Sequence, residues 1–324
     1  MRTVYMETNR PPPRISGAIT ALVTPFENGA LDRVSLMALV EWQIRSGVDG
    51  LVACGLTGEG PVLTEAERAE IIGTCVEIAE GKVPVIAATG TNDTATTIEE
   101  TRHAKALGAT AALVTLPYYS KPGQKGVIHH FETLSAAVDI PIIVHNLPSH
   151  TAIDLAPATV AQLGAITGII GIADGTGNIE RVTDWRRLLP SGSALFSTHD
   201  ATSLGFTLAG GQGVISSASN VAPRLVAAMQ HAAGAGNLPA ASVLLDRLHP
   251  LFRALSRESE PATIKHALAV LEKAKAEVRL PLVCVESDTA GVISDALETL
   301  QAGCKASCDL NAMPRHVVGH YLSL

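Results

Sequence analysis

A glycine-rich turn, Gly55–Gly60, follows an apolar run near the start of the chain and is a first candidate for chemistry. Closely spaced glycines let backbone N–H groups face a bound anion, and Thr57 adds a hydroxyl donor. The same pattern is typical of a tight turn that feeds a helix. On residues alone, an anion site and a plain turn both fit this segment.

Tyrosines and histidines follow two later apolar runs. Tyr118 and Tyr119 are adjacent in a chain with only four tyrosines, and a phenol there could relay protons or close over a substrate. His145 and His150 follow the next run, where an imidazole with a pKa near ~6.5 could shuttle protons or hold a carboxylate. Rim packing and simple hydrogen bonding are the alternatives for these four side chains.

Three more polar turns end apolar runs further along the chain. The run Gly171–Asn178 begins as a strand and turns polar at Asp174, so Ala173 closes its apolar part. The others are Ser197–Asp200 and Gly213–Asn220. The glycines before Val214 would allow close backbone approach, either to a ligand or between closing strands.

The elements that position these turns are eight short apolar or β-branched runs with helical stretches between most of them. The predicted strands are Ala18–Val23, Gly50–Cys54, Val83–Ala88, Ala111–Thr115, Pro141–Val144, Gly168–Ala173, Ala194–Ser197 and Gly213–Ser216. The predicted helices between them include Leu31–Ser46, Glu65–Glu80, Ala95–Leu107, Gln124–Val138 and Pro157–Leu163.

This alternation predicts a TIM (β/α)8 barrel. Strands with few alternating polar positions belong to parallel sheets that are buried on both faces. An open doubly wound sheet would carry a Gly-x-Gly-x-x-Gly turn after its first strand, and here that strand runs into Thr24-Pro25-Phe26. In such barrels the C-terminal ends of the strands carry the active site, which is where the turns described above fall.

Helix signals and composition divide the chain into four parts. A capping box at Thr64 and Glu67 begins one helix. Glycines stand where three helices should stop, at Gly47, Gly81 and Gly108. After the last strand three helices are predicted, at 223–235, 239–258 and 261–276. We therefore predict a Pro-rich lead-in at 1–14, a barrel at 15–221, a C-terminal helical region at 222–301 and a tail at 302–324.

Composition excludes several classes of partner. The 324 residues carry a net charge of −7 without a basic run, which argues against nucleic acid and anionic membranes. No apolar stretch is long enough to span a bilayer, and the first residues lack a secretory h-region. We therefore expect a cytoplasmic protein.

No metal or cofactor site is expected. His129 and His130 are adjacent on a predicted helix and so face different directions. The tail carries Cys304, Cys308, His316 and His320 at zinc-like spacings, but the pairs lie close together in a featureless segment, so zinc is disfavoured.

In their order and spacing, several motifs resemble the dihydrodipicolinate synthase / N-acetylneuraminate lyase family, of class I aldolase type. The similarity covers roughly residues 15–300. The motifs that carry it are Ala21–Phe26, Gly55–Glu59 with Leu63–Arg68, Pro117–Pro122, Asn146–Ser149, Gly171–Asn178 and Gly213–Pro223.

The resemblance implies a mechanism and a set of site residues. A lysine at the end of the sixth strand forms an imine with pyruvate or another 2-oxo acid, and a tyrosine after the fifth strand relays protons. Thr57 and Gly58 match the turn that holds the substrate carboxylate, and Ile215 matches a substrate-binding position. Tyr119 matches a tyrosine that can reach a neighbouring subunit's site. The resemblance implies a homo-oligomer, a dimer or tetramer.

Four departures from the family pattern fall on the chemistry. Ala173 stands at the lysine position and His145 at the relay tyrosine. Leu56 replaces a threonine that links the tyrosines of the synthases. His150 replaces an arginine that binds the second substrate's carboxylate. Since a methyl group cannot form an imine, we predict that Schiff-base activity is absent from this chain.

Three hypotheses follow. In the first, the chain is a lyase-family protein without its standard activity, either a natural diverged paralogue or an engineered lysine replacement; the change at His145 favours divergence. In the second, it is a non-catalytic 2-oxo acid binding or regulatory protein. In the third, His145 and Tyr119 act as an acid–base pair in a non-covalent dehydration.

Overall fold

In the computed structural model, which describes residues 15–306, eight parallel strands close into a barrel in the order β1-β10-β9-β8-β7-β6-β5-β4. The strands are β1 Gly17–Ala21, β4 Gly50–Ala53, β5 Val85–Ala88, β6 Ala111–Thr115, β7 Ile142–Asn146, β8 Ile169–Asp174, β9 Ala194–Ser197 and β10 Gly213–Ser216. A short hairpin, β2 Phe26–Glu27 and β3 Ala30–Leu31, follows the first strand. The predicted TIM barrel is confirmed.

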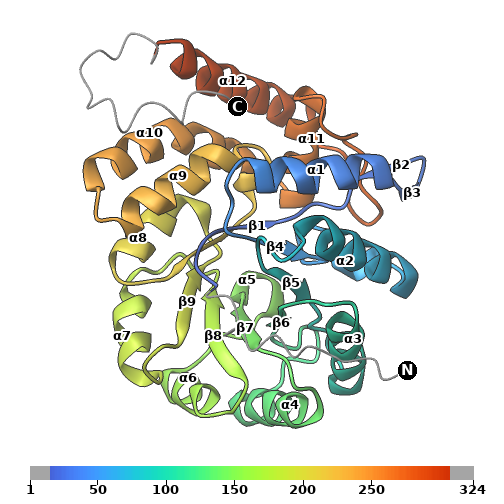
Figure 1. Cartoon of the computed structure of the whole chain (residues 1–324), viewed down its shortest axis with the longest axis vertical. Helices are drawn as coiled ribbons and strands as arrows, with labels where there is room; N and C mark the ends of the chain where they lie inside the picture. The colour runs from blue at the N-terminus through green and yellow to red at the C-terminus, as the bar shows by residue number, and fades with distance from the viewer. Residues whose placement is uncertain (1–14, 307–324) are drawn as a thin grey trace, which may run out of the picture.

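A layer of helices surrounds the barrel (Figure 1). These helices are α1 Arg33–Arg45, α2 Glu65–Ala79, α3 Thr94–Ala106, α4 Gln124–Ala137, α6 Pro157–Gly164, α7 Glu180–Leu188 and α8 Ser203–Leu208, while the short α5 Pro148–Thr151 directly follows β7. The capping box of α2 forms as predicted, because Thr64 and Glu67 exchange side-chain to backbone hydrogen bonds. Gly47, Gly81 and Gly108 take positive φ at the predicted helix stops.

Apolar side chains pack on both sides of the strands, as a buried parallel sheet requires. One cluster fills the barrel interior and includes Ile19, Ile143, Ala173, Phe196 and Ile215. A second, larger cluster lies between the strands and the surrounding helices. Few polar side chains interrupt the interior, so its chemistry is concentrated where the strands end.

Close backbone packing joins the last strand to the first. A Cβ at Gly213 would overlap the backbone of Gly17, and Gly213 pairs in register with that residue. Beyond β10, the Asn220 side chain accepts from Val23 N at 3.0 Å and donates to Ala21 O at 2.7 Å. The glycine that begins β10 and the polar turn that follows the strand therefore both serve barrel closure.

The C-terminal region contains helices α9 Pro223–Gly234, α10 Leu238–Leu255, α11 Glu260–Val270 and α12 Ser287–Ala306. Figure 1 shows them gathered beside α1, at the opposite side of the barrel from α4 and α6. This confirms the predicted C-terminal helical appendage. Helix α11 ends at Val270 and not at 276, because Glu272 takes a left-handed backbone conformation with φ 56°. Helix α12 extends to Ala306, and the Cys308, His316 and His320 positions lie outside the described residues.

Candidate functional site

The C-terminal ends of the strands, which we call the mouth, bring most of the predicted site residues to one side of the barrel. The turn 55–60 follows β4, His145 lies near the end of β7, Ala173 near the end of β8 and Ile215 in β10. Since parallel strands end at the same edge, their last residues meet around one opening.

The turn after β4 is held rigidly and leaves two donors open. Its backbone closes on itself through Gly60 N to Gly55 O at 2.9 Å, and the Thr24 hydroxyl donates to Gly58 O at 2.7 Å. Within residues 15–306, the N–H groups of Thr57 and Gly58 have no hydrogen-bond partner. A Cβ at Gly58 would lie 2.8 Å from Leu22 O, so glycine is needed there.

Glu59 anchors this turn to the C-terminal region. The residue is buried with a left-handed φ of 55°, and its carboxylate pairs with Lys265 of α11. The same carboxylate accepts from Arg279 N at 2.9 Å. Burial lowers the pKa of Lys265, and Glu59 opposes that shift. Sequence reasoning missed this pair; its one signal is a lysine in the middle of a mostly apolar helix.

His145 and Ala173 are neighbours on two adjacent strands. The two residues are paired in register between β7 and β8, and Ala173 is paired in turn with Phe196 of β9. Ala173 has no exposed surface and belongs to the interior cluster with Phe196 and Ile215. The residue at 173 therefore points into the barrel at the level of His145.

His145 is neutral at ordinary pH. Desolvation lowers its pKa to about 4, and the nearby His150 contributes in the same direction. Its Nε2 lies 3.3 Å from Thr198 Oγ1, beyond the end of β9. The imidazole can therefore act as a hydrogen-bond donor and acceptor in the mouth without carrying charge.

The residues next to these inward-facing side chains fix the strand ends from outside. Asn146 donates to Asp174 Oδ1 at 2.8 Å and to Asp154 Oδ1 at 3.0 Å, while Arg181 donates to Asp154 at 2.7 Å. Desolvation raises the pKa of Asp174, and its hydrogen bonds oppose the shift. Because alternate residues of a strand face opposite sides, this network leaves His145 facing inward.

The remaining predicted residues lie nearer the rim. Leu56 is partly exposed on the turn after β4. His150, in α5, has Nδ1 2.9 Å from Ser149 Oγ, and desolvation lowers its pKa. Tyr119 is 90% exposed with a φ of 67° and makes no hydrogen bond to residues 15–306. The structure thus places Tyr119 at the surface, outside the group formed by His145, Ala173 and Ile215.

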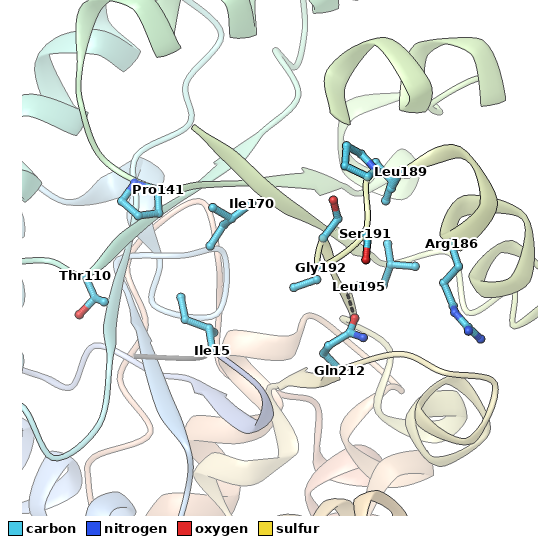
Figure 2. A pocket seen from close by; sticks show the side chains of 13 residues that line it. Ile15, Thr110, Pro141, Ile170, Arg186, Leu189, Ser191, Gly192, Leu195 and Gln212 are labelled. Atoms are coloured by element: carbon cyan, nitrogen blue, oxygen red, sulfur yellow. Dashed lines mark hydrogen bonds between the residues drawn. The ribbon is translucent and has the colours of Figure 1, made fainter. Parts of the chain in front are cut away.

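A cavity of about 900 Å³ lies at the other end of the barrel. It is lined by residues that begin strands, among them Ile170, Ala194 and Gln212 (Figure 2). Gln212 accepts there from Leu195 N at 2.5 Å, and Arg186 supplies a positive charge. This cavity is separate from the mouth, because it lies at the N-terminal ends of the strands. That end of such a barrel serves stability more than catalysis.

In the described part of the chain, no group of three or more His, Cys, Asp or Glu side chains could hold a metal ion. Among residues 15–306, no helix has the length and apolarity needed to cross a membrane.

Comparisons with known proteins place this chain in a family. Residues 14–300 match the Dihydrodipicolinate synthetase family. The 4-hydroxy-tetrahydrodipicolinate synthase of Methylobacterium radiotolerans is 44% identical over 284 residues, which cover 88% of this chain and 95% of that protein. The synthase structure from Methylacidiphilum fumariolicum SolV has a TM-score of 0.88 at 35% identity, covering 91% and 99% of the two chains. A chloride-inhibited dihydrodipicolinate synthase from Acinetobacter baumannii, complexed with pyruvate, has a TM-score of 0.86 at 36% identity, covering 88% and 99%.

Proposed function

The chain belongs to the dihydrodipicolinate synthetase family, and from that premise we propose that its mouth binds pyruvate or a related 2-oxo acid without forming a Schiff base. The observation that carries this proposal is Ala173. It occupies the family's lysine position by motif, and its methyl group faces the barrel interior beside His145. Without an amine at that position, the ketone carbon of the ligand meets no nucleophile.

The turn after β4 supports the binding half of the proposal. The open N–H groups of Thr57 and Gly58 are donors of the kind that a carboxylate accepts. Thr57 is buried, and its hydroxyl makes no hydrogen bond to residues 15–306, so it is available as a third donor. These donors support the proposal that the chain keeps the carboxylate-holding part of the family site.

Other lysines do not supply the missing amine. Lys265 is fully buried in its ion pair with Glu59 and also donates to Glu277 O at 2.8 Å. Lys121 and Lys125 lie beyond β6 on the loop and at the start of α4. Lys265 belongs to α11 and the other two to the segment after β6, so none of the three starts from the strand that carries Ala173.

The rim residues fit the same proposal. Leu56 and His150 would border the ligand with uncharged side chains, and Ile215 would pack against it from β10. The exposure of Tyr119 and its left-handed backbone conformation fit a side chain that reaches a neighbouring subunit. We therefore propose a homo-oligomer, a dimer or tetramer. We also propose that the protein acts in the cytoplasm.

Borohydride reduction in the presence of labelled pyruvate tests the covalent half. We expect no labelled protein by mass spectrometry, while the Methylobacterium radiotolerans synthase, run in parallel, should be labelled. Calorimetric titration with pyruvate tests the binding half, with Thr57→Val as the variant that should bind more weakly. A reduced adduct on this chain would refute the first half, and a titration without heat or thermal shift would refute the second.

A non-covalent dehydratase is the second candidate. The observation that favours it is the neutral imidazole of His145, which could take or give a proton in an elimination. Tyr119 would have to act from a neighbouring subunit, because it is exposed in the single chain. Turnover of 2-hydroxy or 3-hydroxy acids that His145→Phe abolishes would support this activity over simple binding.

A further inference from the structure

A hydrogen bond crosses strand β8 at the mouth of the barrel. His145 lies on β7 and Thr198 just beyond β9, and β8 runs between these two strands. The imidazole Nε2 and the threonine Oγ1 nevertheless lie 3.3 Å apart. Neither residue is a neighbour of the other in the sheet, so their contact must pass above the inward face of β8.

Small residues on β8 leave the space for this contact. Ala173 faces inward, and because side chains alternate along a strand, Gly175 occupies the next inward position. A Cβ at Gly175 would lie 2.8 Å from the Thr198 Oγ1 and would also overlap the Leu147 side chain. The inward face of β8 thus carries only a methyl group and a hydrogen where the contact crosses it.

The backbone holds Thr198 in place. Its N–H donates to Asp174 O at 2.8 Å, and Gly175 N donates to Asn146 O at 2.9 Å, so the strand ladder continues past the ends of β8 and β9. Within residues 15–306, the Thr198 hydroxyl has no hydrogen-bond partner other than His145. The other ring nitrogen of His145, Nδ1, is unbonded there and is not sealed from solvent.

We propose that Thr198 is a positioning residue whose hydroxyl donates to His145 Nε2 and so fixes the Nδ1–H tautomer toward the ligand. This inference rests on the proposed function, because it concerns how the same mouth receives a 2-oxo acid. The ketone oxygen of such a ligand accepts hydrogen bonds, so the imidazole must present an N–H to it. A neutral imidazole carries a single N–H. If that N–H is on Nδ1, then Nε2 is an acceptor, and the Thr198 hydroxyl must donate to it.

The tautomer can be measured without any ligand. Long-range proton–nitrogen NMR on the full chain, with labelled histidine, distinguishes the two ring nitrogens of His145, assigned with His145→Phe. We expect Nδ1–H in the wild type, a mixture of tautomers in Thr198→Val, and a return to Nδ1–H in Thr198→Ser. A packing role alone would alter the melting temperature of Thr198→Val and leave the tautomer unchanged.

Affinity for pyruvate provides the second readout. Loss of one neutral hydrogen bond predicts roughly two- to tenfold weaker binding by Thr198→Val, with recovery in Thr198→Ser. The matched control is Thr207→Val on α8. It removes a hydroxyl that donates a hydrogen bond of 2.8 Å to the Gln230 side chain of α9, and it should change neither readout.

The two proposals fail separately. Wild-type protein that binds no pyruvate but shows the expected tautomer series would overturn the proposed function alone. An Nε2–H tautomer in the wild type, or a Thr198→Val spectrum identical to it, would overturn the role of Thr198 whatever the affinity.

Discussion

Lys265 and Glu59 form an ion pair in which neither side chain is exposed, and the pair joins helix α11 to the turn that follows β4. The lysine Nζ also lies 4.0 Å from the centre of the Phe26 ring, on the hairpin after β1. Three segments that are distant in sequence therefore meet beneath Thr57 and Gly58. The C-terminal region is in this way part of the support for the mouth.

Replacing Lys265 by methionine should destabilise the protein by about 3–5 kcal/mol, because it leaves the Glu59 carboxylate buried without its partner. Urea denaturation measures the loss. The double variant Glu59→Gln/Lys265→Met should recover part of it, since no buried charge is then unpaired. Lys275→Met is the control, because that lysine is 65% exposed and should change stability by less than about 0.5 kcal/mol. Equal losses of stability in Lys265→Met and Lys275→Met would contradict this account.

Gly60→Ala should damage both the turn and the affinity for pyruvate. A Cβ there would overlap the carbonyl oxygen of Cys54, which is backbone and cannot move aside. We expect a loss of at least about 1–3 kcal/mol in unfolding free energy, with weaker pyruvate binding by calorimetry. Gly73→Ala is the control: nothing lies within 4 Å of its new Cβ on α2, so it should stabilise the helix by roughly 0.5–1 kcal/mol. Unchanged stability in Gly60→Ala would show that the turn is pliable.

His145 should make the protein less stable as the pH falls. Its pKa of about 4 in the folded protein lies below the unfolded value of 6.5. Between these values the unfolded chain binds a proton that the folded chain does not, so stability declines from about pH 6.5 towards pH 4. The slope from this one group is at most about 1.4 kcal/mol per pH unit.

The measurement is a comparison between the wild type and His145→Gln at pH 7.5 and pH 5. His130 and His150 also have lowered pKa values, so both proteins should lose stability on acidification. The wild type should lose more, since it alone retains His145. Identical losses would mean that His145 is as well hydrated as in the unfolded chain.

His231 should show the opposite pH dependence. Its Nε2 lies 2.8 Å from Asp49 Oδ2, and this hydrogen bond raises the pKa of His231 above its ordinary value of 6.5. The stabilisation is then fully present below pH 6.5 and is lost as the pH rises through the folded pKa. The melting temperature of His231→Gln should fall below that of the wild type by more at pH 6 than at pH 9. A gap that widens towards pH 9 would contradict the pairing.

The barrel was predictable from sequence because apolar runs and glycine stops carry local signals. Ala111–Thr115, Ala194–Ser197 and Gly213–Ser216 form strands with the predicted bounds. The end of α11 was not predictable, because Lys273–Glu277 continues a helical composition. There the chain turns back so that Arg279 N can reach Glu59, which is a contact across 220 positions.

The site was predictable only in part, for a related reason. Thr57, His145 and Ala173 lie at strand ends that the alternation of elements locates. The pairing of His145 with Thr198 joins strands that are not adjacent in the sheet, and it depends on the absence of side chains at Gly175 and beyond Cβ at Ala173. Such a contact leaves no periodic signal in the sequence.

Ala173→Lys should by itself restore imine formation with pyruvate only in part. The new side chain would start beside Phe196, from a position without exposed surface. Its path toward the mouth is crossed by the contact between His145 and Thr198. Overpacking of this kind costs about 1–3 kcal/mol, and the amine would have to displace the imidazole to reach a ligand. Borohydride trapping should therefore yield more labelled protein from Ala173→Lys/Thr198→Ala than from Ala173→Lys. Complete labelling of the single variant, at unchanged stability, would mean that the space above residue 173 is free and that only the amine is missing.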